Sequence, residues 1–364
     1  LAAVITPDFE QAADYYQKAI QLEPGFAGHH YALGDTLLAS NQPERAAESL
    51  EKALEINQEY LEAWLALADS YTVMEKLPDA RACAAKALDL APDHFSGRKI
   101  MARIAYLQGD YPGAETQLIG VLGQNPNDIE AIALLAKTLS AERQPEQALK
   151  LIDKAINLDE GNLELELQKI DLIQQVEGYH AAIDALRLVS SQYPDQYPVA
   201  LTLVKTLAEA GESDQAIRTA QDILHNGELS HTRDQKAELH LIAGRLLRST
   251  GQLDQAVHHL HQAKNINGYA YQAALELGQA HYDRRQYEQA LKQIQNAIKT
   301  SPEVAEGYYL AGKVLKELKK YAQAEKMLRR AAKLAPNDLK IHRQLGVLVT
   351  LNLVHGDPRS KEYV

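Results

Sequence analysis

This sequence has few cysteines and lacks long apolar runs, and each of these absences excludes a class of structure. Its 364 residues include one cysteine, Cys83, which leaves no partner for an intrachain disulfide and no set of thiolates for a zinc cluster. No apolar run reaches the length of a membrane-spanning helix. We therefore expect neither a disulfide-bonded domain nor direct insertion into a membrane.

The sequence also lacks the short motifs of common enzymes. It contains no phosphate-binding loop, no Gly-x-Gly-x-x-Gly turn and no His-Glu-x-x-His zinc motif. His258, His259 and His261 form its densest histidine group, but no third or fourth ligand stands nearby, so a solvated helix face explains them better than a metal. Cys83 stands among small residues and is expected to be a packed, unreactive thiol. We predict no catalytic site, no metal and no cofactor.

The charge balance narrows the class of partner. Forty-nine acidic residues against thirty-eight lysines and arginines give a formal net charge of −11, which argues against nucleic-acid binding. Eighteen tyrosines against three phenylalanines and one tryptophan suit half-buried contacts between helices, where the ring packs and the hydroxyl reaches water. The partner class that remains is a protein or a peptide.

A pattern of 34 residues runs through the chain and is clearest in 305–338. Tyr308, Ala311, Gly312 and Leu315 follow the i, i+3, i+4, i+7 spacing of one helical face, and a similar pattern follows a polar gap and ends at Pro336. Each unit therefore predicts two antiparallel helices that cross at small residues. The alanine of the second helix recurs every 34 residues, with one interval of 40, as Ala12, Ala46, Ala80, Ala114, Ala148, Ala182, Ala216, Ala256, Ala290 and Ala324.

These units resemble the tetratricopeptide repeat family over nearly the whole chain. The resemblance implies an all-α fold, a right-handed superhelical solenoid of 34-residue helix–turn–helix repeats that share one elongated core. The predicted parts are the second helix of a truncated first repeat in 1–26, six repeats ending in a six-residue insertion in 27–236, three repeats in 237–338, and a final first-type helix with an irregular tail in 339–364.

The first residue, Leu1, already lies inside a repeat, so the chain is expected to be a fragment of a longer protein. For that reason the lack of a signal peptide does not determine the compartment. It favours the cytoplasm over the periplasm only slightly. Cut ends of a solenoid would also allow self-association.

Two segments depart from the repeat pattern. The fifth unit has Glu166, Lys169 and Ile170 where the family prefers an apolar or aromatic residue, a leucine and a small residue, so we expect weaker packing and a bend there. Residues 226–236 hold the six extra residues. Asn226-Gly227 is a turn signal within them, and Ser230 or Thr232 is expected to cap a lengthened helix.

A candidate binding surface follows from numbering each unit from the start of its first helix. Positions 2, 5, 9 and 12 form a stripe beside the packed face, and by resemblance that stripe lines the concave surface of the superhelix. The predicted groove residues are Lys99, Arg103, Lys137, Lys205, Leu241, Arg245, Arg248, Leu275, Tyr309, Lys313 and Lys316. Two interpretations stay open: ordinary charge scatter on a solvated face, or an amphipathic groove for an extended or helical segment that carries acidic residues.

The leading hypothesis for function is a non-catalytic protein–protein interaction scaffold. The alternative is a substrate-recruiting helper domain of a larger enzyme, since similar arrays precede sulfotransferases and glycosyltransferases. Arrays of the glycosyltransferase kind typically show an asparagine ladder on the inner face, whereas the sixth positions here hold no asparagine. A clamp for a C-terminal carboxylate is a third hypothesis, because Lys99, Arg103 and Lys137 resemble its basic part, although its asparagines are missing.

Overall fold

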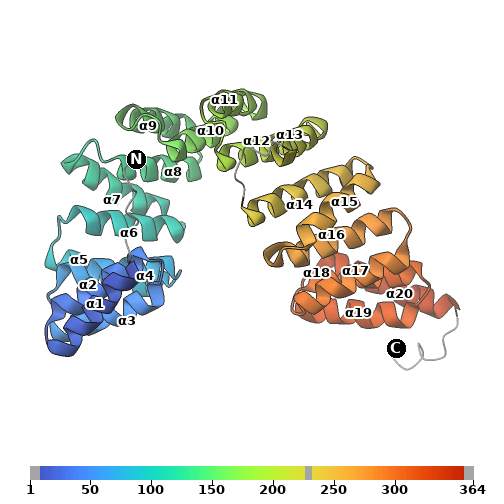
Figure 1. Cartoon of the computed structure of the whole chain (residues 1–364), viewed down its shortest axis with the longest axis horizontal. Helices are drawn as coiled ribbons and strands as arrows, with labels where there is room; N and C mark the ends of the chain where they lie inside the picture. The colour runs from blue at the N-terminus through green and yellow to red at the C-terminus, as the bar shows by residue number, and fades with distance from the viewer. Residues whose placement is uncertain (1–8, 226–231, 356–364) are drawn as a thin grey trace. The chain divides into compact units, whose positions relative to one another are not determined.

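The computed structural model describes residues 9–225 and 232–355, and within these ranges the side chains of Asn267 and of residues 352–355 are not described. These residues form twenty α-helices and one short 3-10 helix, η1 (Asn267–Tyr269), and no strand occurs among them (Figure 1). The predicted all-α, tetratricopeptide-like helical solenoid is confirmed. The stub of a first helix predicted at residues 1–5 lies outside the described ranges.

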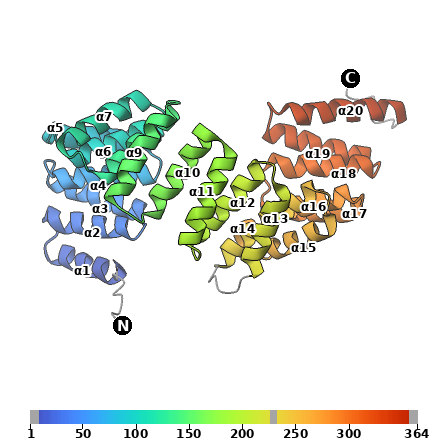
Figure 2. The same cartoon turned by 90° about the horizontal axis from the view of Figure 1, so that it is seen from above.

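Two kinds of helix alternate along the chain. The first-type helices are α2 (Ala27–Ala39), α4 (Leu61–Val73), α6 (Phe95–Leu107), α8 (Ile129–Ala141), α10 (Leu163–Glu177), α12 (Tyr197–Glu209), α14 (Arg233–Ser249), α16 (Ala270–Asp283), α18 (Ala305–Glu317) and α20 (Leu339–His355). The second-type helices are α1 (Phe9–Leu22), α3 (Pro43–Ile56), α5 (Leu77–Leu90), α7 (Tyr111–Gln124), α9 (Pro145–Leu158), α11 (Tyr179–Gln192), α13 (Ser213–His225), α15 (Leu253–Lys264), α17 (Tyr287–Thr300) and α19 (Tyr321–Leu334). Successive helices such as α18, α19 and α20 pack side by side (Figure 2).

Small residues set the close approach of the two helices within a repeat. The repeated alanines from Ala46 to Ala324 are fully buried, with exposures of 0%. Gly312 on α18 faces Leu328 on α19, and a Cβ atom at Gly312 would lie 2.5 Å from Leu328 Cγ. The backbone of the first helix therefore touches a leucine of the second, which no larger residue at position 312 would allow without displacement.

The turn inside each repeat depends on one residue with left-handed backbone. Its φ is positive at the fifteenth position of eight units, namely Asn41, Glu75, Gly109, Arg143, Gly211, Gly251, Arg285 and Lys319. In the fifth unit the positive φ of 91° falls one residue later, at Gly178, because α10 continues to Glu177. A left-handed residue reverses the chain within a few residues, so the second helix folds back onto the first.

The chain divides into two compact units, residues 1–178 (unit 1) and 179–364 (unit 2). The boundary falls at Gly178, within the fifth repeat. Helix α10 itself packs against α9, and Ile170 is buried with 3% exposure, while Lys169 Nζ lies 2.8 Å from Asp153 Oδ1. The domain limits that the sequence predicts at residues 26, 236 and 338 stay a prediction.

Helix α14 begins at Arg233, four residues before the predicted unit start at Ala237. The Thr232 hydroxyl accepts a hydrogen bond from the Gln235 backbone N–H at 3.2 Å, and the Gln235 side chain accepts one from the Thr232 N–H at 2.9 Å. This capping box satisfies two amide groups that the helix leaves unpaired, so Thr232 is the cap. The predicted turn at Asn226-Gly227 and Ser230 lie outside the described residues.

Candidate functional site

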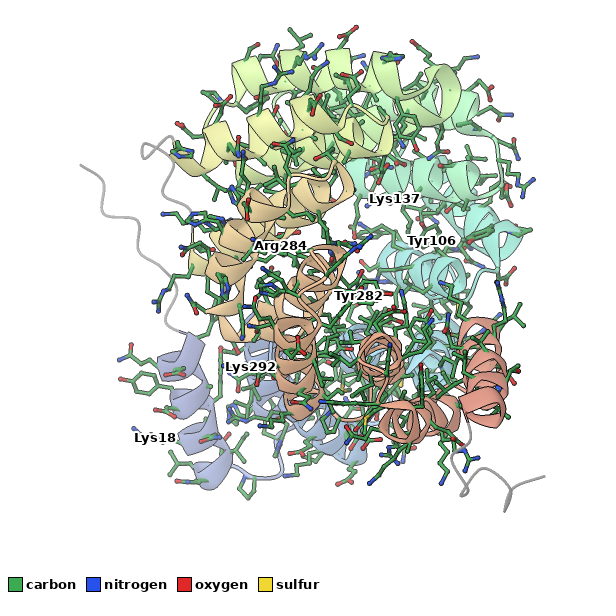
Figure 3. The ribbon with its side chains drawn as sticks, turned by 90° about the vertical axis from the view of Figure 1, so that its right-hand side faces the viewer. Lys18, Tyr106, Lys137, Tyr282, Arg284 and Lys292 are labelled. Atoms are coloured by element: carbon green, nitrogen blue, oxygen red, sulfur yellow. The ribbon has the colours of Figure 1, made fainter. Side chains whose placement is uncertain are left out.

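We define the inner row as positions 2, 5, 9 and 12 of the first-type helices, the stripe on which the predicted groove residues stand. Successive first-type helices touch one another within each unit, as α4 and α6 do in unit 1 and α14, α16 and α18 do in unit 2. The inner row therefore runs as a continuous surface along each unit. Figure 3 draws the side chains and labels three of its members, Tyr106 and Lys137 in unit 1 and Tyr282 in unit 2.

The predicted basic residues of unit 1 are all paired with carboxylates of the chain. Lys99 Nζ lies 2.6 Å from Glu130 Oε2 and 3.3 Å from Asp128 Oδ2, with both carboxylates at or just before the next first-type helix. Desolvation alone would lower the pKa of Lys99, but these two carboxylates outweigh it and raise the pKa. The ammonium is therefore held charged by the protein itself.

The other two basic residues of unit 1 follow the same rule. Arg103 forms an ion pair with Asp69 of the preceding first-type helix. Burial raises the pKa of Asp69, and the charge of Arg103 opposes that rise. Lys137 Nζ lies 3.4 Å from Glu164 Oε1 on α10. The side chains that resemble the basic part of a carboxylate clamp thus already hold carboxylates.

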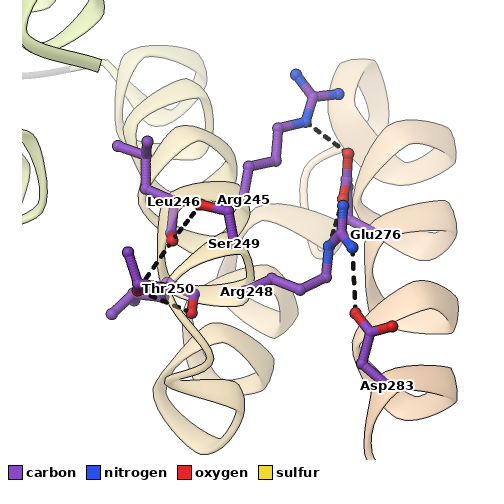
Figure 4. Close-up of polar contacts among 8 residues, drawn as sticks. Arg245, Leu246, Arg248, Ser249, Thr250, Glu276 and Asp283 are labelled. Atoms are coloured by element: carbon purple, nitrogen blue, oxygen red, sulfur yellow. Dashed lines mark hydrogen bonds and ion pairs between the residues drawn. The ribbon is translucent and has the colours of Figure 1, made fainter. Parts of the chain in front are cut away.

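Unit 2 carries a four-residue charge network, shown in Figure 4. Arg245 Nε lies 2.7 Å from Glu276 Oε1, and Arg248 Nε lies 3.3 Å from Glu276 Oε2. Arg248 also reaches Asp283, with Nη1 3.1 Å from Oδ2. The Glu276 side chain is only 12% exposed, so its charge is compensated by two guanidinium groups rather than by water.

Two more predicted cations of unit 2 are paired. Lys205 Nζ lies 3.0 Å from Glu238 Oε1, and the Tyr197 hydroxyl donates a hydrogen bond to the other oxygen of the same carboxylate at 3.0 Å. Lys316 Nζ lies 3.4 Å from Glu317 Oε1 on its own helix. The first pair links two helices and the second joins consecutive residues, and both reduce the unpaired positive charge on this part of the inner row.

The apolar residues of the predicted groove are not uniformly exposed, and here the structure corrects the expected stripe. Leu241 and Leu275 are 3% and 7% exposed and belong to the core of unit 2. Position 5 faces the neighbouring helices in these repeats, which removes both leucines from the surface. Tyr309 is half-buried, and burial is the largest of the effects that raise the pKa of its hydroxyl.

Lys313 differs from the other predicted cations. Among the described residues no carboxylate lies within ion-pair distance of its ammonium. Its Nζ lies instead 5.1 Å from the centroid of the Tyr282 ring and 5.9 Å from that of Tyr309. Both distances are within the range of a cation–π interaction, which positions the ammonium without neutralising it.

Among the described residues, clefts open on the inner row of both units. The cleft in unit 1 has a volume of about 190 Å³ and is lined by α4, α6 and α8, including Lys99 and Arg103. The cleft in unit 2 has a volume of about 110 Å³ and is lined mainly by α14, α16 and α18, including Arg248 and Lys313. A larger cleft of about 320 Å³ lies at the start of unit 1 between α1, α2 and α3. We place the candidate site on the inner row because a cleft between three successive first-type helices occurs there in both units, about one helical turn further along the helices in unit 2.

The sequence reasoning missed the acidic residues that pair with the predicted cations. A signal for part of them was present, because glutamate recurs at position 2 as Glu62, Glu130, Glu164, Glu238 and Glu306. Glu130, Glu164 and Glu238 each hold a cation of the preceding first-type helix. The sequence reasoning also missed Tyr282, a position 12 residue that contacts the Lys313 ammonium.

The remaining reactive side chains are packed or dispersed. Cys83 is buried, and burial raises the pKa of its thiol to about 11, so the thiolate is a minor form at neutral pH. His258 and His261 are exposed, while His259 is buried against His240. In the part of the chain that the structure describes, no three His, Cys, Asp or Glu side chains are arranged to hold a metal ion, and no helix is long and apolar enough to cross a bilayer.

Comparison with protein families gives one result over most of the chain. Two family models, both described as tetratricopeptide repeat, match residues 6–60 and 275–338 and residues 37–104 and 105–168 respectively. Human protein O-mannosyl-transferase TMTC3 is 26% identical over 153 residues, which span 41% of this chain and 17% of that protein. The chain therefore corresponds to a small part of the curated relative it matches.

Solved structures of similar fold extend over nearly the whole chain. The human IFIT1 dimer with PPP-AAAA has a TM-score of 0.52 at 19% identity, covering 91% of this chain and 78% of that one. YrrB, described as a tetratricopeptide protein with an unusual peptide-binding site, has a TM-score of 0.41 at 23% identity and covers 53% of this chain. At these identities the likeness shows the fold alone.

Proposed function

Because this chain belongs to the tetratricopeptide repeat family, we propose that it is a non-catalytic scaffold that binds an extended or helical protein segment along its inner row. The observation that carries the proposal is that, in both units, a cleft lined mainly by three successive first-type helices opens on the inner row. A segment lying across these helices would meet the same kinds of side chain in successive repeats. Such repetition suits recognition of an elongated ligand.

The charge pattern bears on what such a segment carries. The inner row alternates cations and carboxylates, as in the pairs of Lys99 with Glu130 and of Arg103 with Asp69, rather than presenting a uniformly basic surface. A ligand of mixed polarity fits this pattern better than a strongly acidic one. Exposed ion pairs contribute about 0–1 kcal/mol each, so apolar contacts in the clefts would supply much of the affinity.

The proposal is tested by selecting binders from an array of short peptides and mapping where they bind. Hydrogen exchange of the full chain, with and without each selected peptide, should show added protection on α4, α6 and α8 or on α14, α16 and α18. Second-type helices such as α19 serve as the internal reference. Protection confined to the second-type helices would contradict binding at the inner row.

A second candidate is a helper domain that recruits substrates to an attached enzyme. It is favoured by the match to TMTC3, a protein named as an O-mannosyl-transferase, although the match spans only 17% of that protein. The test is the coding sequence on either side of these residues. A catalytic domain in the same open reading frame would support a helper-domain function. An open reading frame without a catalytic domain would contradict it.

A further inference from the structure

We propose that the cleft of unit 2 receives one apolar side chain of a bound protein segment while Lys313 pairs with an acidic side chain of the same segment. This inference rests on the proposed function and specifies both the place on the inner row and the chemistry of the ligand. The evidence for this inference is the size and lining of the cleft, together with the ion-pair partners of the cations that surround the cleft.

The cleft has an apolar floor and a polar rim. The apolar lining residues Ile294, Leu310 and Val314 are buried, whereas the polar ones, Gln279 and Asp283, are half-buried and exposed, respectively. Its volume of about 110 Å³ is somewhat smaller than the cavity of about 150 Å³ that accommodates benzene in an engineered protein. A branched aliphatic side chain such as leucine or valine is therefore the largest apolar group that it would enclose.

The cations at this rim are not equivalent toward an acidic ligand. Arg248 is held by Glu276 and Asp283, and a ligand carboxylate would have to displace groups that are tethered to the same chain. Tethering gives such groups a high effective concentration, so displacing them gains little. The Lys313 ammonium lies over the rings of Tyr282 and Tyr309 and forms no ion pair among the described residues. An acidic group would gain a new charge contact at Lys313 without breaking an old one.

The surroundings of Lys313 also select the kind of anion. Asp283 lines the same cleft, and Glu306 lies close enough for Lys313 to counteract the rise that burial causes in the pKa of Glu306. One unpaired cation beside carboxylates suits a singly charged side chain, whereas a polyanion such as RNA would meet repulsion. The net charge of −11 adds to that repulsion. The occupant we expect is thus a protein segment with one aliphatic and one acidic side chain close together.

The test uses the full chain and fluorescein-labelled peptides in a Gly-Ser background. Each peptide contains one leucine and one glutamate, and the set varies their separation from adjacent to one helical turn. Fluorescence anisotropy gives Kd for each peptide, for its Glu-to-Gln and Leu-to-Ala versions, and for a 5′-phosphorylated RNA oligomer. At the best separation, either peptide change should weaken binding about tenfold, which is about 1.4 kcal/mol.

Two variants locate the contacts. Lys313→Gln should weaken binding of the leucine–glutamate peptide about tenfold but should not change the Kd of the Glu-to-Gln peptide. The protein change and the peptide change each remove the same ion pair, so the second has no further effect. Lys326→Gln on α19 removes an equally positive but exposed side chain from a second-type helix and should have no effect. Gln279→Phe should fill the cleft and abolish the difference between leucine and alanine peptides. If circular dichroism shows that this variant is misfolded, the leucine peptide and its Leu-to-Ala version still test the cleft on the unchanged protein.

Equal effects of Lys313→Gln and Lys326→Gln would overturn the assignment of Lys313. Tight RNA binding that depends on Lys313 would overturn the choice of a protein ligand. Absence of binding by every leucine–glutamate peptide would overturn the site as well. The proposed function would survive that last result if the peptide array still returned ligands that protect the first-type helices, and would fail with it if the array returned none.

Discussion

His240 Nδ1 on α14 lies 2.9 Å from His259 Nδ1 on α15, so the two imidazoles share one hydrogen bond inside the helix pair. One ring must donate and the other accept, which requires at least one neutral imidazole. Burial, followed by the charges of His259, His258, His225 and Lys236, lowers the pKa of His240 to about 4. Burial also lowers the pKa of His259.

This contact predicts a loss of stability in mild acid. Above pH 6.5 the histidine is neutral in both the folded and the unfolded state, so its titration does not change the free energy of unfolding. As pH falls from 6.5 toward 4, the unfolded state takes up a proton that the folded state does not, and the free energy of unfolding decreases. The loss should be roughly 2 kcal/mol, less than the full pKa difference implies, because the ring is only half-buried. Urea unfolding and hydrogen exchange of α14 and α15 between pH 7 and about pH 5 would measure it.

The double variant His240→Leu with His259→Leu should show a flatter dependence on pH over the same interval. His342→Asn, which changes an exposed histidine, is the control and should retain the dependence of the unchanged protein. If all three proteins lost stability in parallel, carboxylates elsewhere rather than this pair would be the cause.

The small residue at the helix crossing predicts a contrast between two glycines one repeat apart. Gly312→Ala should destabilise unit 2 by about 1–3 kcal/mol because its Cβ would meet Leu328. Gly346→Ala should be neutral or stabilising by up to about 1 kcal/mol, since among the described residues no atom outside its own helical turn lies within 4 Å of the added Cβ and alanine favours helix. Urea midpoints of both variants give the comparison. A similar cost at both positions would show that helix propensity, not the crossing, limits this position.

The left-handed turns predict stabilising substitutions. Arg285 and Lys319 have φ values near 60°, a conformation that costs residues with a Cβ roughly 1–2 kcal/mol. Arg285→Gly or Lys319→Gly should therefore raise stability by up to about 1 kcal/mol, after the extra entropy of glycine in the unfolded chain is subtracted. Asn41→Gly should gain less, because asparagine tolerates this conformation. Thermal unfolding monitored by circular dichroism is the measurement, and a loss of stability at both cationic positions would contradict the expectation.

The fifth repeat predicts uneven protection along the array. Amide exchange should be faster in residues 163–175 of α10 than in residues 305–318 of α18. Lys169 takes the place of an apolar contact in α10, and its ion pair with Asp153 is partly exposed and worth only about 0–1 kcal/mol. Mass spectrometry after brief labelling would compare the two segments. Equal protection would mean that the buried Leu165, Ile170 and Leu172 compensate fully.

The sequence by itself determined the repeat and much of its internal structure. The spacing of the alanines from Ala46 to Ala324 predicts helices that cross at small residues, and these alanines are all buried. Thr232 was one of two caps that the sequence predicted, because a capping box involves residues only three positions apart. Such features depend on contacts within one repeat, where the chain fixes which residues meet.

Only the tertiary structure decided which charges on the inner row remain available. Arg245 reaches Glu276 and Lys137 reaches Glu164 across to the next first-type helix, and the rotation and offset of that helix determine whether position 9 meets position 6 or position 2. The burial of Leu241 depends on the same geometry, and so does the absence, among the described residues, of a carboxylate within ion-pair distance of Lys313. Residues about thirty positions apart meet there through packing, so no short spacing in the sequence encodes their distances.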